Sequence, residues 1–448
     1  MNDEAKSFYK SLTRVVWPMA LQNLISAAVN SADIVMLGYV GQTAIAATSL
    51  AGNVAFILFM ISTGLSSGLV MLCAQYWGKK DIDSIKTLLG IALRICCSVE
   101  IIVAIIAAVY PRILMLIFTS DPAMITEGCK YLRAVSLSYV CLSFAQMYQA
   151  GFKSIERVKI VTICSTTTLF LNIGLNATFI FGLFGVPKMG IVGVGIATSI
   201  ARFIEMVFCF IYASFQKDVN FSLACIFRKN KVLTRDFFKY SMPAVGNELV
   251  WGAAFAMYSV IMGHLGEDIV AANSVVNTVR QLASVLCFGM AYGGAIVLGK
   301  NMGAGQLDVA ERNAARLAKV TILSGVFGCV LMLCLYPVLP FIADLNETAA
   351  HYRNILLFIN SYSVIGAATN TVLICGIFRA GGDSKFGFIA DIINMWCISV
   401  PLGLLAAFVF KLPPLWVYFI LYLDEFEKMP AVFIHYFKKG WLRNITRD

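Results

Sequence analysis

The chain has 448 residues, of which 59% are hydrophobic and 13% charged, with a formal net charge of +10. A soluble protein is about a quarter charged, so this composition excludes an ordinary water-soluble domain and predicts a polytopic membrane protein. The N-terminus shows no cleavage site after a short apolar core, so we expect no removable signal peptide. The thirteen cysteines include no CxxC pair, which favours buried thiols over redox or metal chemistry.

Apolar runs along the whole chain predict twelve transmembrane helices. Each run is near or above the ~20 residues that cross the hydrocarbon core. The runs lack the alternation of a membrane barrel, so the predicted fold class is an all-α membrane protein. The predicted spans are 14–37, 50–76, 88–110, 131–152, 160–183, 190–213, 239–262, 274–299, 316–338, 353–378, 386–410 and 413–437.

The chain contains an internal repeat. Residues 18–84 and 243–309 align without a gap at an offset of 225, and Pro18 aligns with Pro243. Five of the six glycines in the first window align with glycines in the second. A duplication in so apolar a chain is typical of membrane transporters built from two similar halves.

The polar stretch around 214–238 falls where two such halves would join. It predicts a six-helix bundle over 1–213, a cytoplasmic connector over 214–238 and a second six-helix bundle over 239–448. Because six is even, both halves enter the membrane from the same side and are parallel repeats.

Most lysines and arginines fall in the loops on one side of the membrane. The positive-inside rule therefore predicts that both termini are cytoplasmic. This topology accounts for the net positive charge, so we expect no nucleic-acid binding. The connectors on this side are 79–86, 153–159, 217–239, 300–319 and 379–385.

Polar residues inside the first-half spans are the first candidates for an ion site, because ionisable groups at membrane depth are costly unless they serve a function. A buried carboxylate with amides and hydroxyls around it takes a proton or coordinates Na⁺. Asn172 and Asn176 are one turn apart and share a helix face. The alternative for Asp33 is that it lies near the outer end of its span and meets water. The first-half candidates are Gln22, Asn23, Asp33, Asn172, Asn176 and Thr198, with Asn30 as a further neighbour of Asp33.

The second half offers Glu248, beside Asn247 in span 7, and Asp391, three residues before Asn394 in span 11. Glu248 aligns in the repeat with Asn23. If Glu248 and Asp391 face each other, they share a proton or a cation, because two nearby carboxylates resist simultaneous ionisation. The alternative for Glu248 is a hydrogen bond to the backbone that Pro243 leaves unpaired.

Span 12 contains a cluster of charges. Glu425 and Lys428 are one turn apart, a spacing that favours a local ion pair. For the cluster, which also includes Asp424 and Glu427, a structural role and a transport role both remain open. Other charged residues within spans are interpreted as buried pairs or snorkelling groups: Arg94, Arg202 with Glu205, and Arg280.

Small residues and prolines recur in both copies of the repeat. The GxxxG pairs Gly64–Gly68 and Gly289–Gly293 predict close helix packing. Pro18 and Pro243 weaken the hydrogen-bond ladder of spans 1 and 7, which permits bending.

No enzymatic motif is complete. The run GAIVLGK ending at Lys300 is followed by Asn301 where a phosphate-binding loop needs Ser or Thr. The three histidines, His264, His351 and His435, have no metal-ligand spacing. We therefore expect no enzyme, no cofactor and no structural metal, and we expect an ion gradient to supply the energy.

Several segments together resemble the multidrug and toxic compound extrusion (MATE) transporters. The segments are GYVGQTAIAATSLAGN and GHLGEDIVAANSVVN in the two repeats, AQYWGKKD after span 2, FIFGLFGVPKMGIVGVGIATSIAR across spans 5 and 6, and FRAGGDSKFG between spans 10 and 11. The resemblance covers essentially the whole chain. It implies export of organic, often cationic, compounds in exchange for H⁺ or Na⁺ across the plasma (inner) membrane.

The resemblance also implies site residues. Asp33 matches the family's span-1 acid, and Thr198 matches its span-6 threonine. Asn172 and Asn176 match a polar pair that is often Asn then Asp, so one carboxylate is missing here. Glu248 lies about a turn before the family's span-7 acid, and Asp391 resembles an acid found in some members.

These matches lead to a set of expectations. Na⁺ or H⁺ binds at Asp33 or at Glu248, small organic molecules and membrane lipid are the partners, and the protein is a monomer. The alternatives are a lipid-linked saccharide flippase, which would need a cationic cavity that mid-span Arg and Lys are too scarce to build, or a membrane enzyme.

Overall fold

The structure is a computed structural model that describes residues 3–38, 42–216, 219, 221, 223–339 and 345–447. Within these ranges the description leaves out the side chains of residues 27–35, 37, 38, 42, 43 and 45.

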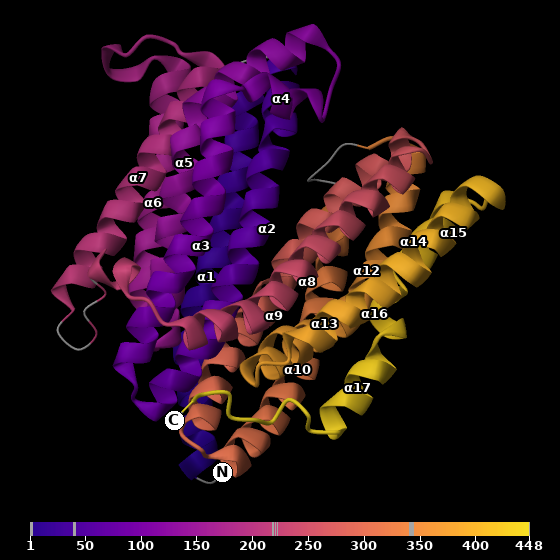
Figure 1. The fold of residues 1–448 in the computed structure, drawn as a ribbon. Coiled ribbons are helices and arrows are strands. Elements are labelled where there is room, and N and C mark those ends of the chain that lie inside the picture. Colours follow the sequence, from indigo (N-terminus) through magenta and orange to yellow (C-terminus); the bar gives the residue numbers. More distant parts are fainter. Residues whose placement is uncertain are drawn as a thin grey trace. The chain divides into compact units, whose positions relative to one another are not determined.

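Helices make up nearly all of the described chain, and no strand occurs in it (Figure 1). Each predicted span falls on one of these helices or on a run of consecutive helical segments. Nine helices of the described part are long and apolar enough to cross a membrane. The predicted all-α membrane class is confirmed. The first eight helices are α1 (Asp3–Gly38), α2 (Gln42–Lys79), α3 (Ile82–Val109), α4 (Pro111–Leu116), α5 (Pro122–Ser154), α6 (Val158–Phe181), α7 (Gly190–Phe215) and α8 (Lys231–Gly263).

The remaining α-helices and the π-helical stretches belong to the second half of the chain. They are α9 (Glu267–Gly303), α10 (Leu307–Leu335), α12 (Glu347–Thr371), η4 (Val372–Phe378), α13 (Ser384–Asp391), η5 (Ile392–Ser399), α14 (Val400–Leu404), η6 (Leu405–Val409), α15 (Pro414–Leu421), α16 (Asp424–Glu427) and α17 (Met429–Phe437). The short 3₁₀ turns are η1 (Leu183–Gly185), η2 (Leu223–Phe227) and η3 (Tyr336–Val338).

The chain divides into two compact units. The N-terminal unit comprises residues 21–73 and 80–241, and the C-terminal unit comprises residues 1–20, 74–79 and 242–448. Each unit therefore includes the end of a helix from the other half of the sequence. The division of the sequence into 1–213, 214–238 and 239–448 remains a prediction.

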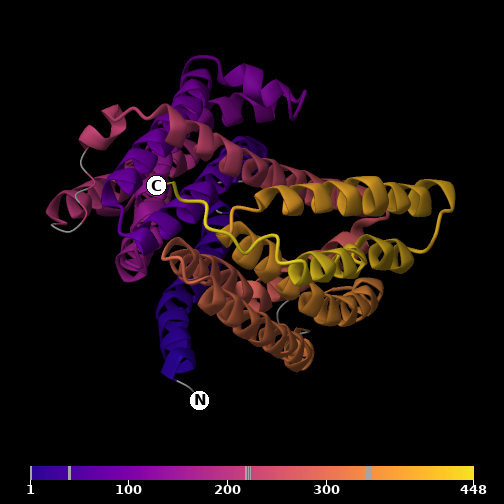
Figure 2. The same cartoon turned by 60° about the horizontal axis from the view of Figure 1, so that its bottom comes forward.

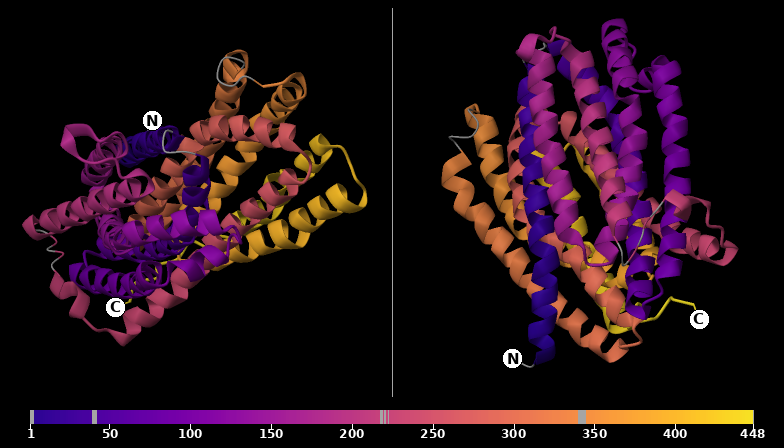
Figure 3. Two further views of the ribbon diagram at one scale, coloured as in Figure 1. Left: turned by 90° about the horizontal axis from the view of Figure 1, so that it is seen from above. Right: turned by 90° about the vertical axis from the view of Figure 1, so that its left-hand side faces the viewer.

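In the N-terminal unit, α5 packs against both α3 and α7, and α7 also packs against α6 (Figure 3). The helix ends follow from local chemistry. Asp121 caps the first turn of α5 by accepting from the backbone N–H of Ala123, and Pro122 supplies a first residue that needs no partner. Gly182, with φ of +74°, ends α6 in the left-handed conformation that glycine adopts without strain.

Repeat-equivalent glycines make equivalent close contacts. A Cβ atom added to Gly68 would lie 2.0 Å from the Oγ of Ser241, within the N-terminal unit. A Cβ added to Gly293 would lie 3.1 Å from a methyl group of Val16, within the C-terminal unit. Gly68 aligns with Gly293 in the repeat, and Val16 and Ser241, two residues before the aligned windows, are separated by the same offset of 225. The second glycine of each GxxxG pair therefore allows a close helix approach, as predicted.

A second reciprocal contact joins the ends of α2 and α9 within the C-terminal unit. A Cβ on Gly78 would lie 2.0 Å from the carbonyl oxygen of Lys300, and a Cβ on Gly303 would lie 1.9 Å from that of Gln75. Gly78 and Gly303 are equivalent in the repeat, as are Gln75 and Lys300. Gly78 of the first repeat thus contacts Lys300 of the second, and the equivalent Gly303 contacts the equivalent Gln75. Such a reciprocal pair of contacts is expected where two parallel repeats pack against each other.

In the C-terminal unit, α9, α10 and α12 pack against one another, and α14 packs against α15 (Figure 2). The predicted continuous span 413–437 is wrong in one respect, because the helix is interrupted at Tyr422–Leu423 and again at Lys428. Pro430 follows the second break and has no N–H to donate into a continuing helix. The charged residues of span 12 lie at these breaks.

Candidate ion-coupling site

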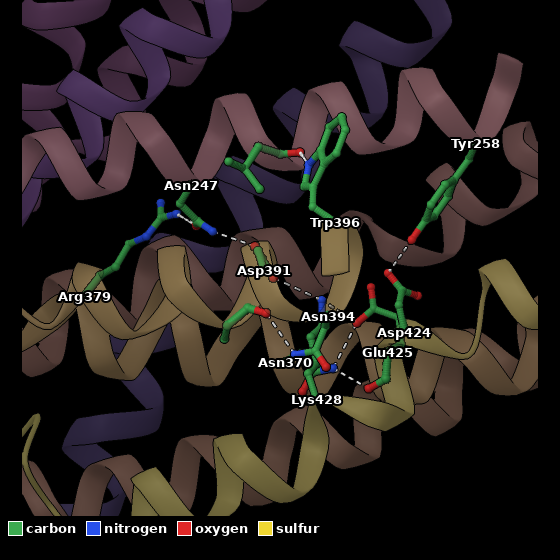
Figure 4. A network of polar contacts seen from close by, with 12 residues as sticks. Asn247, Tyr258, Asn370, Arg379, Asp391, Asn394, Trp396, Asp424, Glu425 and Lys428 are labelled. Carbon is green, nitrogen blue, oxygen red and sulfur yellow. Dashed lines mark hydrogen bonds and ion pairs between the residues drawn. The ribbon is translucent and has the colours of Figure 1, made fainter. Parts of the chain in front are cut away.

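A network of polar side chains lies inside the C-terminal unit (Figure 4). Arg379 donates to Glu248 of α8 at 3.0 Å and to the amide oxygen of Asn247 at 2.5 Å. The amide nitrogen of Asn247 donates to Asp391 at 2.5 Å. Asn247 therefore links the cation that neutralises Glu248 to a second carboxylate.

Lys428 continues the network into span 12. Its ammonium group lies 3.5 Å from a carboxylate oxygen of Asp391 and 3.2 Å from one of Glu425. Asn370 of α12 donates to the Glu425 carboxylate at 2.9 Å and to the Glu425 backbone carbonyl at 2.6 Å. One lysine thus serves two acids from different spans.

Asp424 is the network's remaining carboxylate. Its side chain accepts a hydrogen bond from the hydroxyl of Tyr258 at 3.3 Å. No ion pair involving Asp424 occurs among the described residues. Tyr258 aligns in the repeat with Asp33. Where span 1 has an acid, span 7 therefore has a tyrosine whose acidic partner comes from span 12.

Irregular backbone surrounds these groups. Arg379 directly follows the π-helical stretch η4, and Asp391 directly precedes the π-helical stretch η5. Lys428 lies at the second break of span 12. π-Helical turns and broken helices are frequent at functional sites because they turn side chains and carbonyl groups out of the regular ladder.

The network is buried except for the half-buried Glu248, and it has more acidic than basic side chains. Relative exposures are 2% for Asp424, 4% for Lys428 and 5% for Asp391. Its four carboxylates face two paired cations, Arg379 and Lys428. A third cation, Arg280 of α9, lies over the rings of Phe255 and Tyr422 at 5.6 and 5.1 Å from their centroids. The carboxylates are Glu248, Asp391, Asp424 and Glu425. With all groups ionised, one negative charge remains uncompensated.

The sequence-predicted residues of this half occupy different places in the network. Glu248 and Asp391 are linked through Arg379 and Asn247, so each has its own cation. The partner found for Glu248 is a side chain, whereas the alternative interpretation required the backbone near Pro243. Asn394 donates to the carbonyl of Ala390 one turn before it, at 2.9 Å.

The predicted pairing of Glu425 with Lys428 is confirmed. Arg379 lies between the helical segments η4 and α13, at the start of the predicted connector 379–385, but its side chain is 2% exposed and pairs with Glu248. The guanidinium group instead donates hydrogen bonds to Glu248 and Asn247 of α8.

The polar residues of the N-terminal unit form a smaller group. The amide nitrogen of Asn176 donates to the side-chain oxygen of Asn172 at 3.2 Å, and Asn172 donates to the hydroxyl of Thr198 at 3.4 Å. Gln22 and Asn23 are half-buried in α1. The side chains of Asp33 and Asn30 lie outside the described part of the structure.

Sequence reasoning missed three buried residues. Asn370 and Arg379 gave no signal, because an asparagine in span 10 and an arginine at its end fit an ordinary helix boundary. Glu100 gave a clear signal, since it is an acid inside the apolar run of span 3, and its side chain is 1% exposed.

The chain matches a known protein family. The MatE family model matches residues 18–178 and again residues 243–405, so its two copies begin at the prolines that the internal repeat aligns. This chain belongs to the MatE family. The resemblance noted in the sequence is thereby confirmed, and the protein is an integral membrane transporter of the multidrug efflux class, not an enzyme.

Individual relatives of this MATE protein are distant in sequence. It is 24% identical to the uncharacterized transporter YisQ of Bacillus subtilis, over 97% of this chain and 95% of YisQ. It is 24% identical to the multidrug resistance protein NorM of Vibrio cholerae, over 88% of this chain and 86% of NorM. The solved structure of the Vibrio cholerae MATE transporter VcmN in its bent form has a TM-score of 0.87 at 15% identity and 98% coverage of both chains. These likenesses show the twelve-helix fold.

Proposed function

We propose that the protein is a secondary active antiporter that exports organic compounds, cationic or amphipathic in character, in exchange for H⁺ or Na⁺. The multidrug resistance names of its NorM relatives support small organic molecules as substrates. The two similar halves support alternating access, in which the substrate site opens to one side of the membrane at a time.

The uncompensated carboxylate of the C-terminal unit is the observation that carries the proposal. A buried charge without a counterion is costly in a membrane protein. Binding one H⁺ or one Na⁺ removes that charge, and binding an organic cation nearby does the same. A site that accepts either one, but not both, couples the inward movement of the ion to the outward movement of the substrate.

Asp424 is the acid best placed to receive the ion. Glu248 is neutralised by Arg379, and Asp391 and Glu425 share Lys428. Asp424 contacts a neutral hydroxyl, that of Tyr258. A carboxylate and a phenolic oxygen accept either a proton or a hard cation such as Na⁺. This assignment moves the second-half ion site from Glu248 towards Asp424.

The first-half group makes a second contribution in this proposal. Asn172, Asn176 and Thr198 present amide and hydroxyl groups from α6 and α7, and Asp33 would supply their carboxylate. A ligand shifts a conformational equilibrium only by its difference in affinity between states. Ion binding in either unit therefore has to favour the state that releases substrate outward.

Several further expectations belong to the same proposal. The protein acts as a monomer in the plasma membrane, with both termini in the cytoplasm and lipid around its spans. A flippase for pyrophosphate-linked saccharides is disfavoured, because the buried cations Arg379 and Lys428 already contact carboxylates of this chain.

Ethidium transport in vesicles reconstituted with the purified protein tests the function. Uptake is measured with an imposed H⁺ gradient, an imposed Na⁺ gradient, and neither. We expect one gradient to drive ethidium against its concentration, and Asp33→Asn to abolish this uptake while the protein stays folded. Ethidium movement that no gradient influences would refute antiport, and full gradient-driven export by Asp33→Asn would remove Asp33 from the mechanism.

A further inference from the structure

A buried acid in the N-terminal unit lies outside both groups described above. Glu100 is on α3, well inside the helix, and its side chain is 1% exposed. Ser62 of α2, which is fully buried, donates a short hydrogen bond to the Oε1 atom of Glu100. The second carboxylate oxygen, Oε2, is buried and accepts no hydrogen bond from the described residues.

The groups around Glu100 are neutral. On α3 itself, Cys96 contacts the Ser62 hydroxyl at 3.3 Å, and Cys97 accepts a hydrogen bond from Ser143 of α5 at 3.3 Å. Tyr139 of α5 is buried among side chains of α2, α3 and α5. No Lys, Arg or His of the described residues forms an ion pair with Glu100.

The same helices carry a buried apolar cluster. Leu58, one turn before Ser62 on α2, and Ala104, one turn after Glu100 on α3, belong to it together with Tyr139 of α5. An ionised carboxylate in such a place costs several kcal/mol unless it is paired. The environment therefore fits a neutral carboxylic acid better than a carboxylate.

The side chains near Glu100 favour a proton over a sodium ion as the ligand. Na⁺ is a hard cation that prefers carboxylate, carbonyl and water oxygens, whereas thiols suit soft metals. Beside the carboxyl group, the polar side chains named here among the described residues are the hydroxyls of Ser62 and Ser143, two thiols and one phenol. A proton needs only the carboxyl oxygen that receives it.

We propose that Glu100 is a proton-binding site of the transport cycle, so that the N-terminal unit carries H⁺ on a residue of α3. This proposal rests on the ion-coupled export proposed above and names one of its ions. The proton binds to the carboxylate in one conformation and leaves it in the other. The hydrogen bond from Ser62 stabilises the carboxylate after the proton leaves.

Glu205 provides a matched control in the same unit. It is 2% exposed, but it pairs with Arg202 at 2.7 Å and accepts a hydrogen bond from Gln149 at 2.9 Å. Its arginine partner compensates the charge of this carboxylate, a partner that Glu100 lacks among the described residues. Glu100→Gln and Glu205→Gln therefore remove two carboxyl groups of similar burial. The proposal assigns a proton to Glu100, whereas Glu205 has an arginine as its partner.

Infrared difference spectra of the purified protein at neutral pH test the protonation directly. The wild type and Glu205→Gln should show the carbonyl band of a buried carboxylic acid that is absent from Glu100→Gln. If Glu100→Gln does not fold, Ser62→Ala is used, and it should shift the pH at which the band disappears. The same band in wild type and Glu100→Gln, or a band in Ser62→Ala that titrates as in wild type, overturns the proposal.

Proton movement in reconstituted vesicles tests the transport role. A pH-sensitive dye reports protons moved per ethidium. We expect the wild type and Glu205→Gln to move the same number and Glu100→Gln to lose H⁺-driven uptake. An unchanged proton count in Glu100→Gln overturns the role of Glu100. A wild type that transports under neither gradient refutes the antiport instead, and the infrared band still reports on Glu100.

Discussion

The ammonium group of Lys428 lies 3.5 Å from the carboxylate of Asp391, although the two residues belong to different spans. The same ammonium group lies 3.2 Å from Glu425. Because one cation serves two acids, adding or removing a proton at either acid changes the pairing of the other. Lys428 therefore connects span 11 to the broken span 12.

Replacing Lys428 with methionine should destabilise the protein strongly. The change leaves Asp391 and Glu425 buried with no cation between them, and removing one partner of a buried ion pair typically costs about 3–5 kcal/mol. Thermal unfolding in detergent measures the loss. Lys438→Met, at an exposed position close in sequence, should change little. Equal melting temperatures for the two variants would show that the Lys428 pairs contribute nothing to stability.

Replacing Asp424 with asparagine should uncouple transport from the ion gradient. The amide keeps the shape of the side chain and mimics its neutral, ion-bound form, so the network no longer has a charge to neutralise. Ethidium uptake in vesicles should lose its dependence on the imposed gradient. Glu427→Gln removes an exposed carboxylate from the same short helix and serves as the control. Gradient dependence that survives in Asp424→Asn, or that Glu427→Gln loses equally, would contradict the assignment.

Replacing Gly78 with alanine should disturb the contact between α2 and α9. The new Cβ would lie 2.0 Å from the carbonyl oxygen of Lys300, so the helices must separate. Overpacking of this kind typically costs about 1–3 kcal/mol. Gly52→Ala, in the same helix with nothing within 4 Å of the added Cβ, should instead be neutral or slightly stabilising. Unfolding temperatures of the two variants in one detergent decide the point, and equal values would argue against close packing at Gly78.

Acid should weaken the attachment of the N-terminal end of α1 to α10. Hydrogen bonds from Arg312 and Arg316 lower the pKa of Glu4, which precedes the predicted membrane span, to about 2. A group whose pKa is lowered on folding stabilises the folded state above its unfolded pKa and loses that contribution as the pH falls towards its folded pKa. The contribution should therefore be complete above about pH 5 and decline down to about pH 2.

Melting temperatures of the wild type and Glu4→Gln across this range provide the measurement. The difference between them should be small, because the pair is exposed, and should shrink as the pH falls from 5 towards 2. A difference in melting temperature that grows as the pH falls would contradict the prediction.

The sequence was sufficient to predict the scaffold. Hydropathy located the helices, because spans need long apolar runs. The repeat identified positions such as Gly78 and Gly303, whose close contacts the structure shows. The spacing of Glu425 and Lys428 was also sufficient to predict their ion pair, because residues one turn apart are neighbours on any helix.

The ion network itself was not predictable. Arg379 and Glu248 are far apart in sequence, and only the packing of α8 against the end of span 10 brings them together. Tyr258 and Asp424 are separated in the same way. The breaks in span 12 are hidden by its hydropathy, because apolar residues flank the charges on both sides.

The exchange of ion for substrate can be measured directly on the purified protein in weakly buffered detergent. Ethidium is added, and the release of H⁺ and of Na⁺ is followed with a pH indicator and a sodium-sensitive dye. Because the two ligands oppose each other, ethidium affinity must fall as the concentration of the coupling ion rises. The account predicts release of one ion species on ethidium binding, and a smaller release in Asp424→Asn. Ethidium binding that releases neither ion, with an affinity independent of pH and Na⁺, would contradict it.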